Sequence, residues 1–175
     1  MLNLPSTISE WLDALQAPER LRKHLQIVYA VATELVEAIQ AEWPALRIDK
    51  KLVVQGAALH DIGKTKHPNE LYASGNQHPE AGYQMLVEKG YPEALAQIAR
   101  VHEDWNHSDR TLEELLVALS DTIWCGIRNN PLEELVIKQI ADHTQTDFWE
   151  VYIKMDPLLS QIAQGADERL RYQDS

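Results

Sequence analysis

Apolar residues recur every three to four positions along most of this chain, and that helical period restricts the fold more than any other feature of the sequence. No window combines sustained two-residue alternation with the Val, Ile and Thr enrichment that is typical of strands. Helix start and stop residues separate the periodic segments, and no repeat, low-complexity stretch or linker divides them. The sequence therefore predicts an all-α fold.

Capping patterns and stop residues set the boundaries of the predicted helices. Thr7–Glu10 and Thr111–Glu114 have the spacing of a capping box, and Pro18 suits the first turn of a long helix. Gly63 is interpreted as a left-handed stop at a helix C-terminus, and Gly90 closes another helix. The expected helices begin near residue 7 and cover about 18–41, 49–62, 79–89, 92–103, 111–128, 132–143, 147–154 and 157–172, with loops at 64–78 and 105–110.

The length of 175 residues suits one domain with a sizeable core. We expect a single domain over 1–175, with a motif-bearing core at about 18–130 and C-terminal helices at 131–172 packing on it. The N-terminus lacks the basic start and apolar run of a signal peptide, and no window approaches the ~20 apolar residues of a membrane span. The sequence therefore predicts a cytoplasmic protein that has no membrane partner.

The formal net charge of −11 argues against broad electrostatic binding to nucleic acid or to an anionic membrane surface. A small anion would need a compact positive centre on such a chain, and a bound metal ion is the strongest centre of that kind. The single cysteine, Cys125, excludes an internal disulfide framework and a cysteine-rich zinc cluster. Any metal ion would therefore be held by histidines and carboxylates.

Four polar side chains are predicted to point into the core. His24 and His60 lie on the apolar stripes of two different helices, because residues three and four apart share one helix face. Asp121 falls on the buried face of the helix that starts at Thr111. Asp61 follows His60 at the end of a helix rich in small and apolar residues, where an unpaired carboxylate is costly.

Each of these side chains, taken singly, is more simply interpreted as a core residue with its own hydrogen-bond partner. Together, two buried carboxylates and two buried imidazoles need many separate partners, whereas one divalent cation satisfies all four. Carboxylates and neutral imidazoles are ligands that suit Fe, Mn, Zn or Ni. We therefore expect His24, His60, Asp61 and Asp121 to meet at one metal ion.

The order of these residues resembles the HD-domain superfamily of metal-dependent phosphohydrolases. The resemblance covers roughly residues 21–128 and implies an all-α HD-domain helical bundle in which the same four side chains hold one metal ion. The landmarks that carry it are His24, the HDIGK segment from His60 to Lys64, the HPEAG segment from His78 to Gly82, Val101-His102, and Asp121.

Family members that carry the two intervening histidines hold a second metal ion beside the first. By that match Asp61 would bridge the two ions, and His78 and His102 would hold the second. His78 begins a helix where Ser, Thr, Asp or Asn normally serves as the cap, and His102 lies on the apolar face of its helix, so both positions favour a ligand role. The alternatives are two packing histidines and a one-metal centre.

The resemblance implies a hydrolase that attacks a nucleotide or another small phosphoester with a metal-activated water, using one or two ions of Fe, Mn, Ni or Zn. Asp61 and Lys64 are the predicted catalytic residues. Lys64 lies three residues past Asp61 and could reach a metal-bound phosphate, and Arg128 could make a forked contact with the same anion. Either side chain could instead be solvated near a helix C-terminus, where basic residues are common.

Two other functions are compatible with these ligands. Some HD proteins that resemble this ligand set are di-iron oxygenases, which use iron and O₂ to cleave carbon bonds in inositol or phosphonates. The metal ligands alone do not separate such an oxygenase from a hydrolase. A non-catalytic regulatory HD domain would be expected to have lost ligands, and none of the six is missing here. The sequence predicts neither the identity of the substrate nor the oligomeric state.

Overall fold

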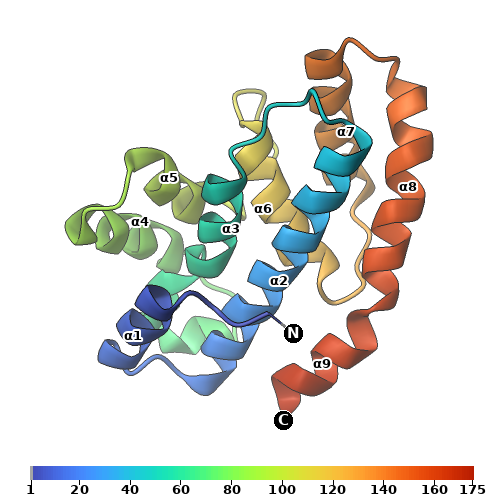
Figure 1. Ribbon diagram of the computed structural model, residues 1–175. Helices are drawn as coiled ribbons and strands as arrows, with labels where there is room; N and C mark the ends of the chain where they lie inside the picture. The colour runs from blue at the N-terminus through green and yellow to red at the C-terminus, as the bar shows by residue number, and fades with distance from the viewer. Residues whose placement is uncertain (1) are drawn as a thin grey trace.

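The computed structural model describes residues 2–175, and in that range the chain is helical with no strand (Figure 1). The predicted all-α fold is confirmed. No helix in the described range is long and apolar enough to cross a membrane. The elements are α1 (Ser6–Ala14), α2 (Glu19–Glu42), α3 (Lys50–Leu59), the 3-10 helices η1 (Ile62–Thr65) and η2 (Pro68–Leu71), α4 (His78–Lys89), α5 (Glu93–Val101), α6 (Leu112–Ile123), α7 (Asn130–Thr144), α8 (Phe148–Gln164) and α9 (Ala166–Asp174).

The long helix α2 occupies the centre of the structure, where it packs against α3, α6, α8 and α9 (Figure 1). One hydrophobic cluster joins α2 to α3, α6, α7 and α8, and a second joins the start of α2 to α1, α4 and α5. The two clusters divide α2 between Leu25 and Ile27. His24 therefore lies near the boundary between two apolar cores, where a polar centre can be enclosed.

The C-terminal helices α8 and α9 both contact α2, the helix that carries His24. The predicted break near Pro157 is wrong. Helix α8 continues through Pro157, and its buried face runs unbroken across the proline from Val151 to Ile162. Burial of that face outweighs the one backbone hydrogen bond that a proline removes from a helix. The division of the whole chain into a single domain stays a prediction.

Caps explain where the helices begin. The capping box at Thr111 is confirmed, because the Thr111 hydroxyl accepts a hydrogen bond from the Glu114 backbone N–H at 3.2 Å and the Glu114 carboxylate accepts one from the Thr111 N–H at 2.9 Å. The predicted box at Thr7 is wrong, since α1 begins at Ser6 without a side-chain cap. Helix α6 is also shorter than predicted, because it ends at Ile123.

Gly63 has a different role from the predicted one. Gly90 adopts the left-handed conformation at the end of α4, with φ of 86°, but Gly63 lies inside η1 and is not among the described glycines with positive φ. A Cβ on Gly63 would collide with the carbonyl oxygen of His78 and would lie 2.6 Å from the backbone nitrogen of Gly82. Glycine is required there because α4 packs directly against η1.

Gly63→Ala is therefore expected to destabilise the protein by about 3 kcal/mol, the upper part of the range for overpacking, because the obstructing atoms are backbone. The control is Gly82→Ala on the facing helix, where the nearest atom would lie at 3.4 Å and the expected change is within about 1 kcal/mol. Urea unfolding of both variants in the presence of a metal chelator measures the difference. Equal midpoints for the two variants would contradict the packing argument.

Candidate metal centre

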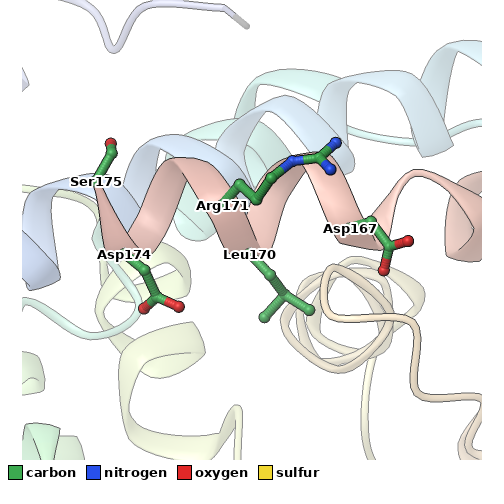
Figure 2. Close-up of a pocket in the computed structure, with 5 residues that line it drawn as sticks. All are labelled: Asp167, Leu170, Arg171, Asp174 and Ser175. Atoms are coloured by element: carbon green, nitrogen blue, oxygen red, sulfur yellow. The ribbon is translucent and has the colours of Figure 1, made fainter.

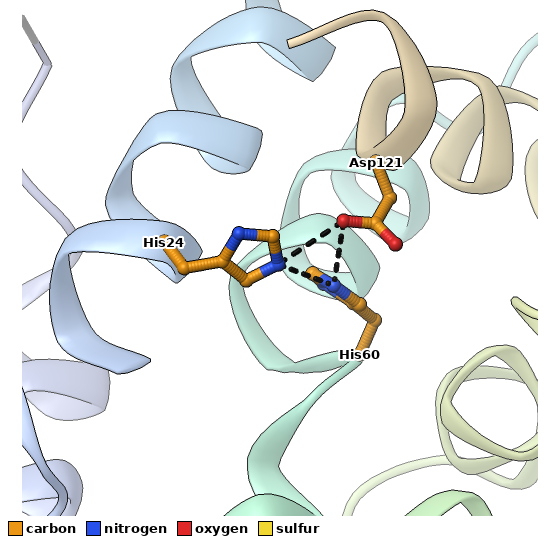
Figure 3. Close-up of side chains that lie close together, drawn as sticks. All are labelled: His24, His60 and Asp121. Carbon is orange, nitrogen blue, oxygen red and sulfur yellow. Dashed lines mark hydrogen bonds and ion pairs between the residues drawn. The ribbon is translucent and has the colours of Figure 1, made fainter. Parts of the chain in front are cut away.

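Six side chains converge where α2, α6 and the beginnings or ends of three other helices meet. His24 comes from α2 and Asp121 from α6, while the remaining four stand at helix ends. Figure 3 shows the imidazoles of His24 and His60 and the carboxylate of Asp121 pointing toward one another from different helices. The structure brings together all six residues predicted to bind metal: His24, His60, Asp61, His78, His102 and Asp121.

The first group of atoms surrounds one point. The Nε2 atoms of His24 and His60 are 3.2 Å apart, and Asp121 Oδ1 lies 3.1 Å from the first and 3.3 Å from the second. Asp61 Oδ2 lies 3.3 Å from His24 Nε2 and 3.6 Å from His60 Nε2. Atoms bound at about 2.1 Å to a common tetrahedral ion lie about 3.4 Å apart, so these separations suit a single metal ion.

The second group of atoms gathers around the other oxygen of Asp61. Asp61 Oδ1 lies 3.2 Å from His78 Nε2 and 3.3 Å from His102 Nε2, and these two nitrogens are 3.5 Å apart. The two oxygens of Asp61 therefore lie nearest to different pairs of imidazoles, while His60, Asp61 and His102 also form one group that could hold an ion. A carboxylate placed in this way has one oxygen free to contact an ion on each side.

Hydrogen bonds on the far side of two imidazoles define which nitrogen faces the centre. His60 Nδ1 lies 2.9 Å from the Ala57 carbonyl oxygen, and His102 Nδ1 lies 2.9 Å from the Ala99 carbonyl oxygen. Because a carbonyl oxygen only accepts, Nδ1 must donate, and the neutral ring then presents a lone pair at Nε2. Outer partners of this kind orient histidine ligands in metal sites.

The charges within the centre call for a cation. Asp61 is 1% exposed, and its Oδ1 accepts no hydrogen bond from any group in residues 2–175. Burial alone lowers the pKa of His24, but the carboxylates of Asp121 and Asp61 raise the pKa to about 9. The pKa of Asp61 lies well below its usual range, because the surrounding histidines outweigh the opposing effect of burial. A pKa of about 9 keeps the proton on His24 at neutral pH, and a divalent metal ion that accepts nitrogen and oxygen ligands would take the place of that proton between the ionised carboxylates.

Glu70 and Glu103 also belong to this region, and sequence reasoning missed both. The Glu70 carboxylate lies 2.6 Å from His78 Nδ1 and accepts a hydrogen bond from the His78 backbone N–H at 3.1 Å. Glu103 Oε1 lies 3.6 Å from His78 Nε2, in a group with His102 that could hold an ion. The available signal for Glu103 was a His-Glu pair after α5 that repeats the His-Asp pair after α3.

Glu70→Gln is expected to weaken metal binding at the second group of atoms by about 10- to 100-fold, because a carboxylate partner orients the imidazole of His78 and raises its basicity. The first group should keep its affinity. Glu88→Gln, an exposed change on the same helix as His78, is the control. Calorimetric titration with Mn²⁺ measures the affinity of both sites. An unchanged Mn²⁺ affinity at the second group of atoms would show that Glu70 does not support that site.

Lys64 contacts a residue of the centre, whereas Arg128 has its hydrogen-bond partners elsewhere. Lys64 Nζ lies 2.6 Å from Asp61 Oδ2. The Arg128 guanidinium instead donates to both carboxylate oxygens of Glu133, at 2.8 and 2.7 Å, to Asp156 at 2.8 Å and to the Ser160 hydroxyl at 2.8 Å. These contacts tie the start of α7 to α8. The predicted substrate contact of Arg128 therefore finds no support in the structure.

A small cavity of about 160 Å³ opens over the centre. Its lining comprises Arg20, His24, Asp61, Lys64, Leu71 and Gln173. A roomier hollow of about 460 Å³ lies along α9 and is lined by Asp167, Leu170, Arg171, Asp174 and Ser175 (Figure 2). That hollow is open, is formed by one helix and contains none of the clustered histidines. The smaller cavity is therefore the candidate substrate site.

Comparison with known proteins relates the chain to two curated relatives. It is 27% identical over 112 residues to a tRNA (cytidine(56)-2'-O)-methyltransferase from Picrophilus torridus, in a match that covers 64% of this chain and 29% of that relative. It is 28% identical over 135 residues to an uncharacterized protein from Methanocaldococcus jannaschii, in a match that covers 69% of this chain and 75% of that relative. No solved structure matches the chain.

The sequence model of the HD domain family matches residues 21–123, which is more than half of the chain. All six clustered histidines and aspartates lie inside that span, and helices α7, α8 and α9 lie beyond it. The predicted motif-bearing core at about 18–130 is close to the matched range. The chain therefore belongs to the HD domain family, a superfamily of metal-dependent hydrolases.

Proposed function

We propose that this protein hydrolyses a small phosphoester, with a nucleotide as the first candidate, at a centre of two divalent metal ions. The observation that carries the proposal is the position of Asp61, whose two oxygens each face a different set of histidines at 3.2–3.6 Å. Family membership supports a metal-dependent hydrolase, and the phosphoester is our extension of it.

The metal-binding residues divide between two ions. His24, His60, Asp121 and Asp61 Oδ2 would hold one ion, and His78, His102 and Asp61 Oδ1 would hold the other. Ions of Fe, Mn, Ni or Zn suit this donor set. When bound, they supply a Lewis acid that activates water and shares the negative charge of the phosphoryl oxygens. In the overall reaction the oxygen of water bonds to phosphorus, the ester P–O bond breaks, and the alcohol leaves with a proton.

Lys64 is suited to hold the phosphate rather than to act as a base. Burial lowers the pKa of Lys64, but Asp61, Asp121 and Glu103 outweigh burial and raise it, so the ammonium is charged at neutral pH. A charged ammonium in the lining of the cavity can donate to a phosphoryl oxygen. Arg20 provides a second cation in the same lining.

The size of the cavity supports a small substrate or the small end of a larger one. At about 160 Å³ it is smaller than the ~300–1,000 Å³ of sites that enclose a drug-sized ligand. It can enclose a phosphoryl group and the atoms next to it, while the remainder of the substrate lies toward the surface. The side chain of Leu71 provides the apolar part of this lining.

Lys64→Ala is expected to raise the KM about 10- to 100-fold while metal content stays unchanged, because the variant loses a charge-assisted hydrogen bond to phosphate and no metal ligand. Lys66→Ala, an exposed change directly after the same 3-10 helix, is the control. Steady-state kinetics on any phosphoester that the wild type hydrolyses, with metal analysis of the same samples, checks both expectations. An unchanged KM for Lys64→Ala would show that this side chain is solvated and does not bind the phosphate.

The proposed function is tested by incubating Mn²⁺-loaded protein, without O₂, with a panel of nucleoside phosphates and sugar phosphates and measuring released inorganic phosphate. Release that depends on Mn²⁺ and is abolished by chelation supports a hydrolase. Turnover that appears only with iron and O₂ would assign the centre to a di-iron oxygenase instead. No turnover under either condition would favour a regulatory HD domain.

A further inference from the structure

The C-terminal helix α9 places one polar side chain at the cavity over the metal centre. Gln173 lines that cavity together with Lys64 and two of the clustered metal-binding residues. Its side chain is buried, at 9% exposure, and its Oε1 has no hydrogen-bond partner within residues 2–175. Buried polar atoms are normally paired, so the unpaired carboxamide oxygen of a residue that lines a cavity indicates a missing partner.

The other buried polar side chain of α9 shows the contrast. Arg169 donates from Nε to the Trp124 carbonyl oxygen at 2.6 Å and from Nη2 to the Ile162 carbonyl oxygen at 2.5 Å. These contacts lock α9 to the end of α6 and to α8. Gln173 lies one helical turn further along and has no equivalent partner for its Oε1. Packing of α9 therefore accounts for Arg169 but leaves the carboxamide of Gln173 unexplained.

Contacts on both sides of Gln173 fix its position relative to the centre. Tyr172 donates a hydrogen bond to the Gln26 side-chain oxygen at 2.8 Å, and Ser175 Oγ accepts one from Lys23 at 3.3 Å. Asp174 pairs with Arg20 at 3.5 Å. All three partners lie on the first turns of α2, the helix that carries His24. The end of α9 is thereby held against the cavity.

We propose that Gln173 recognises the alcohol part of the substrate by accepting a hydrogen bond from a hydroxyl group close to the phosphoryl group. The inference rests on the proposed phosphohydrolase function and names a substrate class for it: phosphoesters of polyhydroxy alcohols, such as the sugar of a nucleotide, in preference to phosphoesters of plain alcohols. Helix α9 lies outside the residues that match the family, so this contact is an addition made by the C-terminal part of the chain.

The cavity lining offers different hydrogen-bonding groups to the phosphate half and to the alcohol half of the substrate. A phosphate dianion carries only hydrogen-bond acceptors, and the cations Lys64 and Arg20, which pair with Asp61 and Asp174 in the structure, carry donors that suit it. The Oε1 of Gln173 is an acceptor and needs a donor as its partner, whereas only the Nε2 of the same carboxamide could donate to a phosphate oxygen. A hydroxyl group is the donor that the alcohol half of a sugar phosphate brings.

The test compares two ligands that differ only in hydroxyl groups and that contain a C–P bond in place of the ester. Calorimetry on the full chain loaded with Mn²⁺, without O₂, would measure the Kd of inorganic phosphate, propylphosphonate and 2,3-dihydroxypropylphosphonate. The wild type is expected to bind the dihydroxy ligand about three- to tenfold more tightly than propylphosphonate, the gain of one neutral hydrogen bond.

Gln173→Leu should abolish that difference while metal content and the Kd of inorganic phosphate stay unchanged. Gln161→Leu makes the same substitution at an exposed position of α8 and should keep the difference. If Gln173→Leu does not fold, Gln173→Ala makes the same test with a smaller side chain.

Equal affinities of the wild type for the two phosphonates, or a difference that survives in the folded Gln173 variant, would overturn the role of Gln173 while leaving the hydrolase intact. A wild-type protein that holds its metal ions but binds none of the three anions would overturn the proposed function and this inference together.

Discussion

Asp61→Asn is expected to lose both metal ions and to lower hydrolysis by on the order of a thousandfold, the upper end of the cost of removing one electrostatic contact to a transition state. The reason is that Asp61 faces both sets of histidines, with one oxygen toward each. Asparagine keeps one oxygen and replaces the other with an amide NH₂, whose nitrogen donates hydrogen bonds and has no lone pair available for a cation. The bridge is therefore lost together with its negative charge.

Metal analysis and thermal unfolding of Asp61→Asn measure this effect. Metal at 100 times its Kd stabilises a protein by about 2.7 kcal/mol, so the wild type should melt at a higher temperature with metal than without it. The variant should lose that increase. Asp142→Asn, an exposed change on α7, should behave as the wild type does. Two bound ions in Asp61→Asn, with normal turnover, would contradict a bridging role.

The double variant His78→Ala/His102→Ala is expected to lose about one metal equivalent and most of the activity. Both imidazoles point Nε2 at Asp61 Oδ1 and neither belongs to the group formed by His24, His60 and Asp121, so the first ion should remain. The second ion matters because two ions share the charge that develops on the phosphoryl group.

A matched control for the double variant is His107→Ala/His143→Ala, which removes two exposed histidines. Metal content by mass spectrometry and turnover should both match the wild type in this control. Full activity of the His78/His102 variant with one ion bound would show that one metal ion is sufficient for hydrolysis and would contradict a need for the second.

The positions of the clustered histidines and aspartates follow from local sequence patterns. His24 could be placed inward because the apolar period of α2 is regular, and Asp121 because α6 begins at a well-defined capping box. His60 and Asp61 stand where the run of small and apolar residues in α3 ends. These patterns are short-range, so one sequence was sufficient to turn His24, His60, Asp61 and Asp121 inward, whereas the assignment of His78 and His102 to a second ion came from the resemblance to the HD-domain superfamily.

Arg128 shows where that reasoning fails. Extending α6 to residue 128 would place Arg128 on the same face as Asp121, but α6 ends at Ile123 and the chain turns at Gly126, where φ is 86°. The turn redirects Arg128 toward Glu133 and Asp156 on the following helices. A helix end that depends on one glycine was not predictable from the apolar period.

Glu70 and Gln173 were missed for a different reason. Glu70 lies in a polar segment whose composition predicts a loop. Its contact with His78 Nδ1 depends on the position of His78 at the start of α4. Gln173 lies 112 positions after Asp61 in the sequence and reaches the cavity only because α9 folds back onto α2. Contacts of this kind come from tertiary packing, which no local pattern encodes.

Anomalous X-ray diffraction from crystals grown with Mn²⁺ tests the central claim most directly. We predict two anomalous peaks on opposite sides of the Asp61 carboxylate, about 3.5–4 Å apart, one against His24, His60 and Asp121 and the other against His78 and His102. A single peak at full Mn²⁺ occupancy, or peaks away from Asp61, would contradict a two-metal centre bridged by this residue.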